Sequence, residues 1–382
     1  MMRSCDILLV ADPRFSGGSA TALLADAAAF RAQGATLGLA LVSSDFFKNA
    51  PDRPNPDLLA LADHPDTVTV HSGDTIRADI AFLHHPLPFH AGLSDRIAIT
   101  ADRAVLVAHH PPFRGDGSLE YSPFRVNRTI DRAFGLRPLW APVSGLVRQQ
   151  LRSFAPFLRL SSEDWLNIFD PALWTASRAP FSDPAAPVLG RHSRPDPLKW
   201  PDTHEDIRRS LDGGPDWRVR IMGCLPELTS ALPATAELLA FNEEPVATFL
   251  NSLDVFAFHH SDRWVEAFGR TVTEAMLMGR PCLLDPRLKG TFGELASYAA
   301  PQDVAAALTH LRTNATATRA RAASVRDTVA TLYGATAVSA RLARLRRDTG
   351  SVSRLGSKAA TPITALRKTI GLMRRQSVGA RG

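Results

Sequence analysis

The 382-residue chain has little cysteine and no long apolar run. Its three cysteines, Cys5, Cys224 and Cys282, lie far apart and fit neither a disulfide framework nor the spacing of a metal-binding motif. No apolar stretch approaches the roughly 20 residues that a membrane-spanning helix needs. The first apolar run is short and is bounded by Asp6 and Asp12, which does not fit a signal peptide. We therefore expect a protein of the reducing cytoplasm.

The net charge of +6 is unevenly distributed along the sequence. From Arg341 to the end, 11 Lys and Arg residues accompany a single acid, Asp348. The rest of the chain holds 33 basic and 37 acidic residues and is close to neutral. A near-neutral body with a basic end segment indicates either contact with an anionic surface or simply a solvated, disordered tail.

Two series of alternating strands and helices follow each other in the sequence. The first series begins with a strand over residues 7–11, a helix over 19–33 and a strand over 36–42. Such a βαβ unit implies a parallel sheet. The second series starts after residues 153–187, a stretch rich in Pro, Ser and Asp that we interpret as the connection. A chain of this length exceeds what one hydrophobic core usually supports, which agrees with two domains.

We predict an α/β protein with two Rossmann-like domains whose parallel sheets face each other across a cleft. The expected domains are residues 1–178, residues 179–348 and a basic tail over 349–382. Within that tail, residues 361–376 place Ile, Leu and Met at spacings of three and four with Lys and Arg between them, which is typical of an amphipathic helix. Open α/β sheets bind their ligands at the carboxyl ends of the strands.

Three apolar runs end in a pair of histidines, and a parallel sheet brings such strand ends to one edge. The pairs are His84/His85, His109/His110 and His259/His260. Adjacent residues on a strand point to opposite faces, and no carboxylate stands at a ligand-like spacing beside any pair. Although His is the commonest metal ligand, the pairs favour a polar cleft with one functional histidine over a metal site.

Polar residues also separate a buried strand from a helix in the stretch DVFAFHHSDRWVEAFGRTVTEAMLMGRP. Glu266 precedes Gly269, which favours a turn, and Glu274 follows in the early turns of the helix. Carboxylates accept hydrogen bonds from sugar or ribose hydroxyls. The amides of Phe268, Gly269 and Arg270 would lie at the helix N-terminus, which attracts an anion such as a diphosphate. The spacing alone fits a second interpretation without a ligand. Glu266 would then be a solvated residue of the loop, and Glu274 would be favoured by the helix dipole.

The segment EAFGRTVTEAMLMGRP resembles the E-x7-E signature of retaining glycosyltransferases with the GT-B fold, especially glycosyltransferase family 4. The match runs from one glutamate through Phe-Gly to a second glutamate, then through Ala-Met to Gly-x-Pro. In that family the first glutamate contacts the donor sugar and the second holds the nucleotide ribose. The resemblance therefore implies these roles for Glu266 and Glu274, and it places the backbone of residues 268–270 near the donor phosphates.

Two further segments agree with this resemblance. VLGRHSRPDPLKWPD is similar to the segment that opens the second domain, which implies that Arg191 and Lys199 bind the diphosphate. Their separation is wider than is usual in the family, which leaves Arg194 as a substitute for one of them. SGGSA resembles the glycine loop that contacts the donor phosphate or the acceptor, which implies Gly17 and Gly18. This loop is not the G-x-G-x-x-G fingerprint of a dinucleotide site, which argues against NAD.

VLVAHHPP resembles the strand end whose histidine lies near the donor sugar. The resemblance implies His109 as a catalytic residue together with Glu266, with His110 as the alternative. His259 and His260 are further candidates, because they end a strand of the second series.

The implied reaction transfers a sugar from a nucleotide-sugar donor to the hydroxyl of a glycan or glycolipid acceptor, with retention of configuration. We expect no metal and no other cofactor, because cationic side chains and the helix N-terminus would stabilise the charge of the leaving diphosphate. By analogy, the product would be a cell-surface polysaccharide or glycolipid. The alternatives are another GT-B enzyme, such as a sugar-nucleotide epimerase or phosphorylase, and a nucleotide- or glycan-binding protein without turnover.

The basic tail predicts its own kind of partner. It lacks the interleaved aromatic residues on which nucleic-acid bases stack, so we expect no nucleic-acid partner. Its stripe of Ile, Leu and Met between basic residues suits an anionic membrane surface better. The expected location is therefore the cytoplasm, with peripheral contact at the inner face of the membrane.

Overall fold

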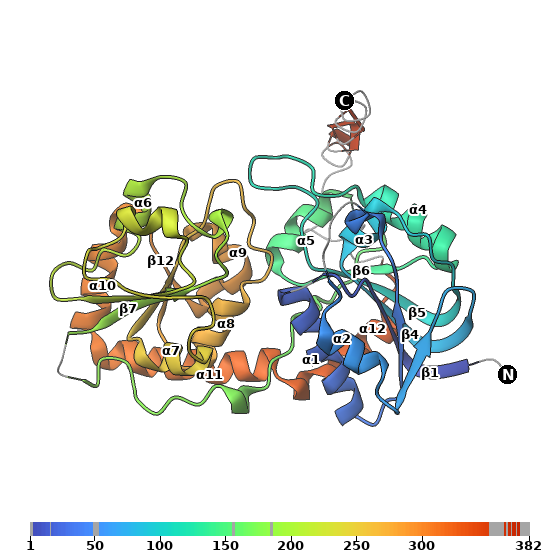
Figure 1. The fold of residues 1–382 in the computed structure, drawn as a ribbon, viewed down its shortest axis with the longest axis horizontal. Helices are drawn as coiled ribbons and strands as arrows, with labels where there is room; N and C mark the ends of the chain where they lie inside the picture. Colours follow the sequence, from blue (N-terminus) through green and yellow to red (C-terminus); the bar gives the residue numbers. More distant parts are fainter. Residues whose placement is uncertain are drawn as a thin grey trace. The chain divides into compact units, whose positions relative to one another are not determined.

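The computed structural model shows two α/β units within the chain (Figure 1). Unit 1 comprises Met1–Ile168 together with the segment from Ala335 onward, and unit 2 comprises Phe169–Gly334. The structure describes residues 3–15, 17–48, 53–154, 157–183, 186–350 and eight positions between 363 and 374. Among these residues, no helix is both long enough and apolar enough to cross a bilayer.

The sheet of unit 1 has six parallel strands in the order β3-β2-β1-β4-β5-β6. The strands are β1 (Arg3–Ala11), β2 (Leu37–Leu41), β3 (Thr67–Val70), β4 (Thr75–His84), β5 (Ala98–Ala108) and β6 (Leu139–Pro142). The helices of this unit are α1 (Gly18–Ala32), α2 (Pro56–Ala62), α3 (Pro86–Ala91), α4 (Pro123–Phe134), α5 (Gly145–Leu151) and α12 (Val338–Arg347). The predicted helix over 19–33 and strand over 36–42 are confirmed as α1 and β2.

Unit 2 repeats this architecture with a second sheet of six parallel strands, in the order β12-β11-β10-β7-β8-β9. The strands are β7 (Val188–His192), β8 (Arg218–Met222), β9 (Glu237–Leu239), β10 (Val255–Phe258), β11 (Cys282–Leu284) and β12 (Ser297–Tyr298). The helices are α6 (His204–Arg209), α7 (Val246–Ser252), α8 (Arg270–Leu277), α9 (Lys289–Phe292), α10 (Val304–Thr313) and α11 (Ala315–Tyr333). The predicted α/β class with two parallel sheets is therefore confirmed.

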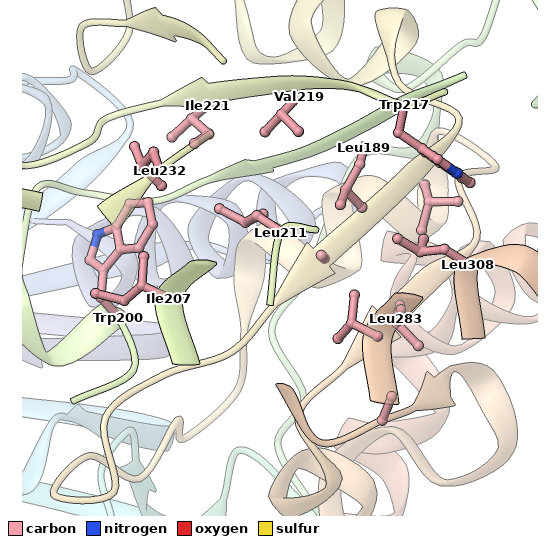
Figure 2. Close-up of a cluster of buried hydrophobic side chains, with 14 of the residues drawn as sticks. Leu189, Trp200, Ile207, Leu211, Trp217, Val219, Ile221, Leu232, Leu283 and Leu308 are labelled. Atoms are coloured by element: carbon pink, nitrogen blue, oxygen red, sulfur yellow. The ribbon is translucent and has the colours of Figure 1, made fainter. Parts of the chain in front are cut away.

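The strands are short apolar runs because helices cover both faces of a parallel sheet, which leaves few positions for polar side chains. Figure 2 shows the resulting core in unit 2. Its labelled side chains are Leu189, Trp200, Ile207, Leu211, Trp217, Val219, Ile221, Leu232, Leu283 and Leu308. Each such side chain contributes on the order of 1.5–3 kcal/mol when fully buried. This packing fixes the strands whose carboxyl ends carry the residues considered below.

The chain divides at other positions than the sequence predicts. Unit 2 begins directly after Ile168, and α12 packs in unit 1, whereas we expected residues 179–348 to form the second domain. Within unit 1, the buried Arg341 of α12 donates a hydrogen bond of 2.7 Å to the carbonyl of Leu166. The amphipathic pattern of this helix predicts that it packs on a core, but not on which of the two cores.

Candidate functional site

The carboxyl edge of the unit 2 sheet gathers most of the residues that the sequence singles out. Strand β7 ends at His192, strand β10 ends at Phe258, and helix α8 begins at Arg270 beyond the loop that follows β10. Because the strands are parallel, their carboxyl ends lie along the same edge of the sheet. A ligand at that edge would meet both the end of β7 and the start of α8.

A tight turn at Gly269 separates the two glutamates, as predicted. Gly269 adopts the left-handed conformation, with φ 79°, and α8 starts at the next residue. A Cβ atom at this position would lie 3.1 Å from the ring of Phe292, so both the backbone angle and the space favour glycine. Glu266 consequently lies on the loop and Glu274 lies in the second turn of α8.

The carboxylate of Glu266 belongs to a partly buried cluster with Lys199 and Trp264. It accepts hydrogen bonds from the Lys199 ammonium and, at 3.3 Å, from the Trp264 indole, and the ammonium lies 4.7 Å from the centre of the indole ring system. Burial alone would raise the pKa of Glu266, but the charge and hydrogen bond of Lys199 outweigh it and hold that pKa below its ordinary value. Glu266 is therefore an ionised acceptor held in one place.

Glu274 lies between two basic side chains. One carboxylate oxygen lies 3.5 Å from Nε2 of His192, and the other lies 3.9 Å from Nε of Arg270. The Arg270 guanidinium in turn lies 4.3 Å from the ring centre of Phe169. These contacts limit the rotamers of a carboxylate that the resemblance assigns to the ribose.

The structure places Arg191 in the interior, where its side chain does not reach the surface. It is only 1 % exposed and donates to the carbonyls of His259 at 3.2 Å and Lys199 at 2.6 Å. Its guanidinium lies 3.7 Å from the ring centre of Trp200, and burial lowers its pKa to about 9. The predicted contact of Arg191 with the diphosphate thus disagrees with this geometry. The side chain points into the unit, and its hydrogen bond to the carbonyl of Lys199 fixes the loop that carries Lys199. Arg194 is exposed and lies 3.9 Å from Asp196.

The histidines at the end of β10 also bond to the backbone. Nε2 of His259 lies 2.9 Å from the carbonyl of Ala299, and Nδ1 of His260 lies 2.9 Å from the carbonyl of Ser261. Burial lowers the pKa of His259 to about 4, and burial followed by the charge of Arg287 lowers that of His260. Both rings are therefore neutral near pH 7 and tie the strand end to its neighbours.

The other two histidine pairs meet at the carboxyl edge of the unit 1 sheet. Nδ1 of His84 lies 3.2 Å from Nε2 of His109, and the ring of His85 lies 4.9 Å from that of His110. His85 has a left-handed φ of 73°, and its Nδ1 accepts a hydrogen bond from the amide of Leu87. Within the described part of the chain, no three His, Cys, Asp or Glu residues are arranged to hold a metal ion.

A cavity in unit 2 lies away from these residues. It has a volume of about 330 Å³ and opens at the amino ends of β11 and β12. Its lining includes Cys282, Ser297, His310, Leu311, Thr318 and Arg321. Because ligands of open α/β sheets bind at the carboxyl ends of the strands, the edge with Glu266 and Glu274 remains the better candidate.

No family model matches the sequence, and no curated protein matches it. Solved structures do match. Anabaena Alr3699/HepE in complex with UDP and glucose has a TM-score of 0.61 at 15 % identity, over 89 % of this chain and 98 % of that one. A glycosyltransferase from Rickettsia africae ESF-5 has a TM-score of 0.59 at 11 % identity, over 93 % and 100 %. An E. coli trehalose-6-phosphate structure bound with UDP-2-fluoro glucose has a TM-score of 0.56 at 11 % identity, over 90 % and 99 %. The chain has the GT-B fold.

The predicted residues divide between the two units of this GT-B fold. Gly17, with φ 81°, precedes helix α1, and Gly18 is its first residue, which is the position predicted for a glycine loop after β1. His109 and His110 follow β5 in the same unit. All the other predicted residues lie in unit 2.

Sequence reasoning missed two side chains that contact the glutamates of unit 2. Trp264 contacts both Lys199 and Glu266, and His192 contacts Glu274. A signal for His192 was present, since it directly follows Arg191 in the segment VLGRHSRPDPLKWPD, which resembles the start of the second domain. Trp264 has no comparable signal in the sequence.

Proposed function

We propose that this protein is a retaining glycosyltransferase that transfers a sugar from a nucleotide-sugar to an acceptor hydroxyl. The observation that carries the proposal is the arrangement of Glu266 and Glu274 around the N-terminus of α8, at the carboxyl edge of a parallel sheet. The match of this stretch to the E-x7-E signature supports retention. The complex of HepE with UDP and glucose favours a uridine diphosphate donor.

Each group of the donor has a residue of suitable chemistry. Glu274 accepts hydrogen bonds from the ribose hydroxyls, and Glu266 accepts them from the sugar. The amides at the start of α8 and the Lys199 ammonium face the diphosphate, whose charge grows as the sugar leaves. With these cations and amides the leaving group needs no metal ion, so we propose metal-independent transfer.

Lys199 has two partners in this scheme. Before the donor binds, its ammonium balances the buried charge of Glu266. A diphosphate competes for the same ammonium and leaves more of the Glu266 carboxylate available to sugar hydroxyls. The ion pair therefore keeps both side chains in position for a ligand that engages them together.

The decisive experiment is calorimetric titration of UDP, GDP and ADP into the metal-free protein and its Glu274→Ala variant. We expect one nucleotide to bind, and we expect the substitution to weaken it at least tenfold, since charged hydrogen bonds contribute about 1.5–3 kcal/mol. Glu294→Ala is the matched control, because this carboxylate is exposed and pairs only with the exposed Lys289 among the ion pairs of the described residues. If the wild type binds none of the three nucleotides, the proposal fails.

A second experiment separates transfer from binding alone. The Glu266→Gln variant should still bind the nucleotide, whereas transfer from the nucleotide-sugar should fall strongly. Release of nucleoside diphosphate together with a glycosylated acceptor identifies a transferase. Tight nucleotide binding with no release from any donor would instead identify a binding protein without turnover.

We further propose that the acceptor is a glycan or glycolipid of the cell surface and that the tail contacts an anionic membrane from the cytoplasmic side. Ile363, Leu366, Ile370 and Met373 are 65 %, 54 %, 37 % and 54 % exposed, and each of the four has a helical backbone. Beyond residue 350, the structure describes these four residues and Arg367, Thr369, Gly371 and Arg374, and the other residues of the predicted tail lie outside the described residues. An exposed apolar stripe between basic residues favours the interface of a bilayer.

Sedimentation with anionic vesicles tests the membrane contact. The full chain should bind at low salt and be released at high salt, because the attraction is screened. A chain that ends at residue 350 should stay in solution. Equal binding of both chains would exclude the tail as the membrane contact.

A further inference from the structure

A buried carboxylate in unit 1 has no place in the proposed donor site. Asp26 lies in α1 and is only 1 % exposed. Its Oδ2 accepts a hydrogen bond of 2.9 Å from the indole of Trp165, whose ring packs against Phe30 and Phe82. Burying an ionised carboxylate among apolar rings costs several kcal/mol unless other groups compensate for it. A sequence that keeps an acid in this position therefore indicates a role for it.

The same oxygen faces a histidine that leads to the strand end. Oδ2 of Asp26 lies 3.7 Å from Nε2 of His84, the last residue of β4. On the other side of that ring, Nδ1 of His84 lies 3.2 Å from Nε2 of His109, which follows β5. Asp26, His84 and His109 thus form a chain of polar groups from helix α1 to the carboxyl edge of the sheet.

The direction of the hydrogen bond between the two rings follows from the negative charge that faces the other side of His84. Burial lowers the pKa of His84 to about 3, so its ring is neutral near pH 7 and carries one N–H. A carboxylate only accepts, so the proton of His84 is favoured on Nε2, facing Asp26. Nδ1 of His84 is then an acceptor, and Nε2 of His109 must be the donor between the two rings. A neutral His109 with its proton on Nε2 has Nδ1 as its acceptor.

We propose that Asp26 and His84 are positioning residues that fix His109 in the Nε2–H tautomer, so that its Nδ1 accepts a hydrogen bond from a substrate hydroxyl. The link to substrate rests on the function proposed above, whereas the tautomer does not. The selection resembles that of a carboxylate that orients a catalytic histidine, here relayed through a second ring. His85 does not take part in this relay, because its Nδ1 accepts from the amide of Leu87.

Nitrogen-15 NMR of the imidazole rings in the full chain tests the tautomer directly. The His109 signals are assigned by their loss in His109→Gln. In the wild type we expect His109 protonated on Nε2. In Asp26→Leu no acceptor faces Nε2 of His84, so neither tautomer of His84 is favoured and His109 should show a mixture of the two forms. An unchanged His109 tautomer in the folded variant would overturn the proposal.

Two control variants keep the test decisive. Trp165→Phe removes the indole donor but leaves the charge of Asp26, so His109 should retain the Nε2–H tautomer. Should Asp26→Leu not fold, His84→Phe keeps a ring in the same place and removes the relay. His109 should then lose its fixed tautomer and show a mixture of the two forms. A His109 tautomer that stays fixed without His84 would also overturn the proposal.

Kinetics connect the relay to the reaction. We expect Asp26→Leu to lower kcat/KM for sugar transfer by about twofold or more, because only part of the population then holds His109 in the Nε2–H form. The affinity for the nucleotide should not change, because Glu274 belongs to the other unit. Absence of nucleotide binding in the wild type would contradict the proposed function and leave the tautomer result standing. Full activity with a mixed tautomer would contradict the substrate contact of His109.

Discussion

Replacing Lys199 by methionine tests the buried ion pair on which the candidate site depends. The side chains of Lys199 and Glu266 are only 13 % and 11 % exposed. Removing one partner of such a pair leaves an uncompensated buried charge and costs about 3–5 kcal/mol. The exposed pair of Lys289 and Glu294, at 64 % and 89 %, provides the control, and Lys289→Met should cost less than about 1 kcal/mol.

The cost should depend on pH with a predictable sign. Without Lys199, burial is the largest influence left on Glu266, and its pKa rises above the ordinary value. A group whose pKa is raised in the folded state loses its stabilising contribution as the pH increases. Lys199→Met should therefore be destabilised most near pH 8 and less at pH 5, where Glu266 takes up a proton.

Urea denaturation of four proteins measures these effects. They are the wild type, Lys199→Met, Lys289→Met and the double variant Lys199→Met/Glu266→Gln. The double variant should recover most of the lost unfolding free energy, because no unpaired charge remains. It should not recover nucleotide affinity, since the ammonium is absent. The reasoning is refuted if Lys199→Met costs no more than Lys289→Met, or if the double variant is as unstable as the single one.

Two further predictions concern the buried basic groups. Arg191→Met removes two charged hydrogen bonds to carbonyls and should lower the unfolding free energy by about 3 kcal/mol in urea titrations, whereas the exposed Arg194→Met should change it by less than about 0.5 kcal/mol. Equal effects would contradict the interior role of Arg191. Burial lowers the pKa of His84 from 6.5 to about 3 and that of His259 from 6.5 to about 4. The stability that each histidine contributes is therefore complete above pH 6.5, and it is lost as the pH falls toward the lowered pKa. Thermal unfolding at pH 4.5 should reveal that the unfolding free energy has fallen by up to about 3 kcal/mol for each histidine. His84→Phe should reduce this pH dependence. An identical pH dependence in that variant would contradict the lowered pKa of His84.

The sequence by itself determined the architecture and the turn between the glutamates. Short apolar runs bounded by helices are local patterns, and they predicted α1 and β2 closely. Gly269 has a left-handed backbone that other residues rarely adopt, so its position predicted where α8 begins. The bounds of α8 in turn placed Glu266 on a loop and Glu274 on a helix. All of these depend on neighbours in the chain.

Only the tertiary structure decided which side chains meet. Lys199 and Glu266 are separated by 67 positions, and His192 and Glu274 by 82, so no local pattern relates them. The resemblance predicted that Arg191 binds a phosphate. In the structure its guanidinium instead packs on Trp200 and donates hydrogen bonds to two backbone carbonyls in the interior.

The buried acid of unit 1 shows most clearly that local sequence patterns do not predict contacts between distant residues. In the sequence, Asp26 is one polar residue in an alanine-rich helix, and no pattern there predicts a function for it. Folding brings Trp165 from 139 positions away to its carboxylate and places His84 beside it. Periodicity predicts which face of a helix is buried, because it depends on residues a few positions apart. What a buried polar group contacts depends on the packing of distant segments, and that is decided only when the sheet, the helices and the connecting loops fold together.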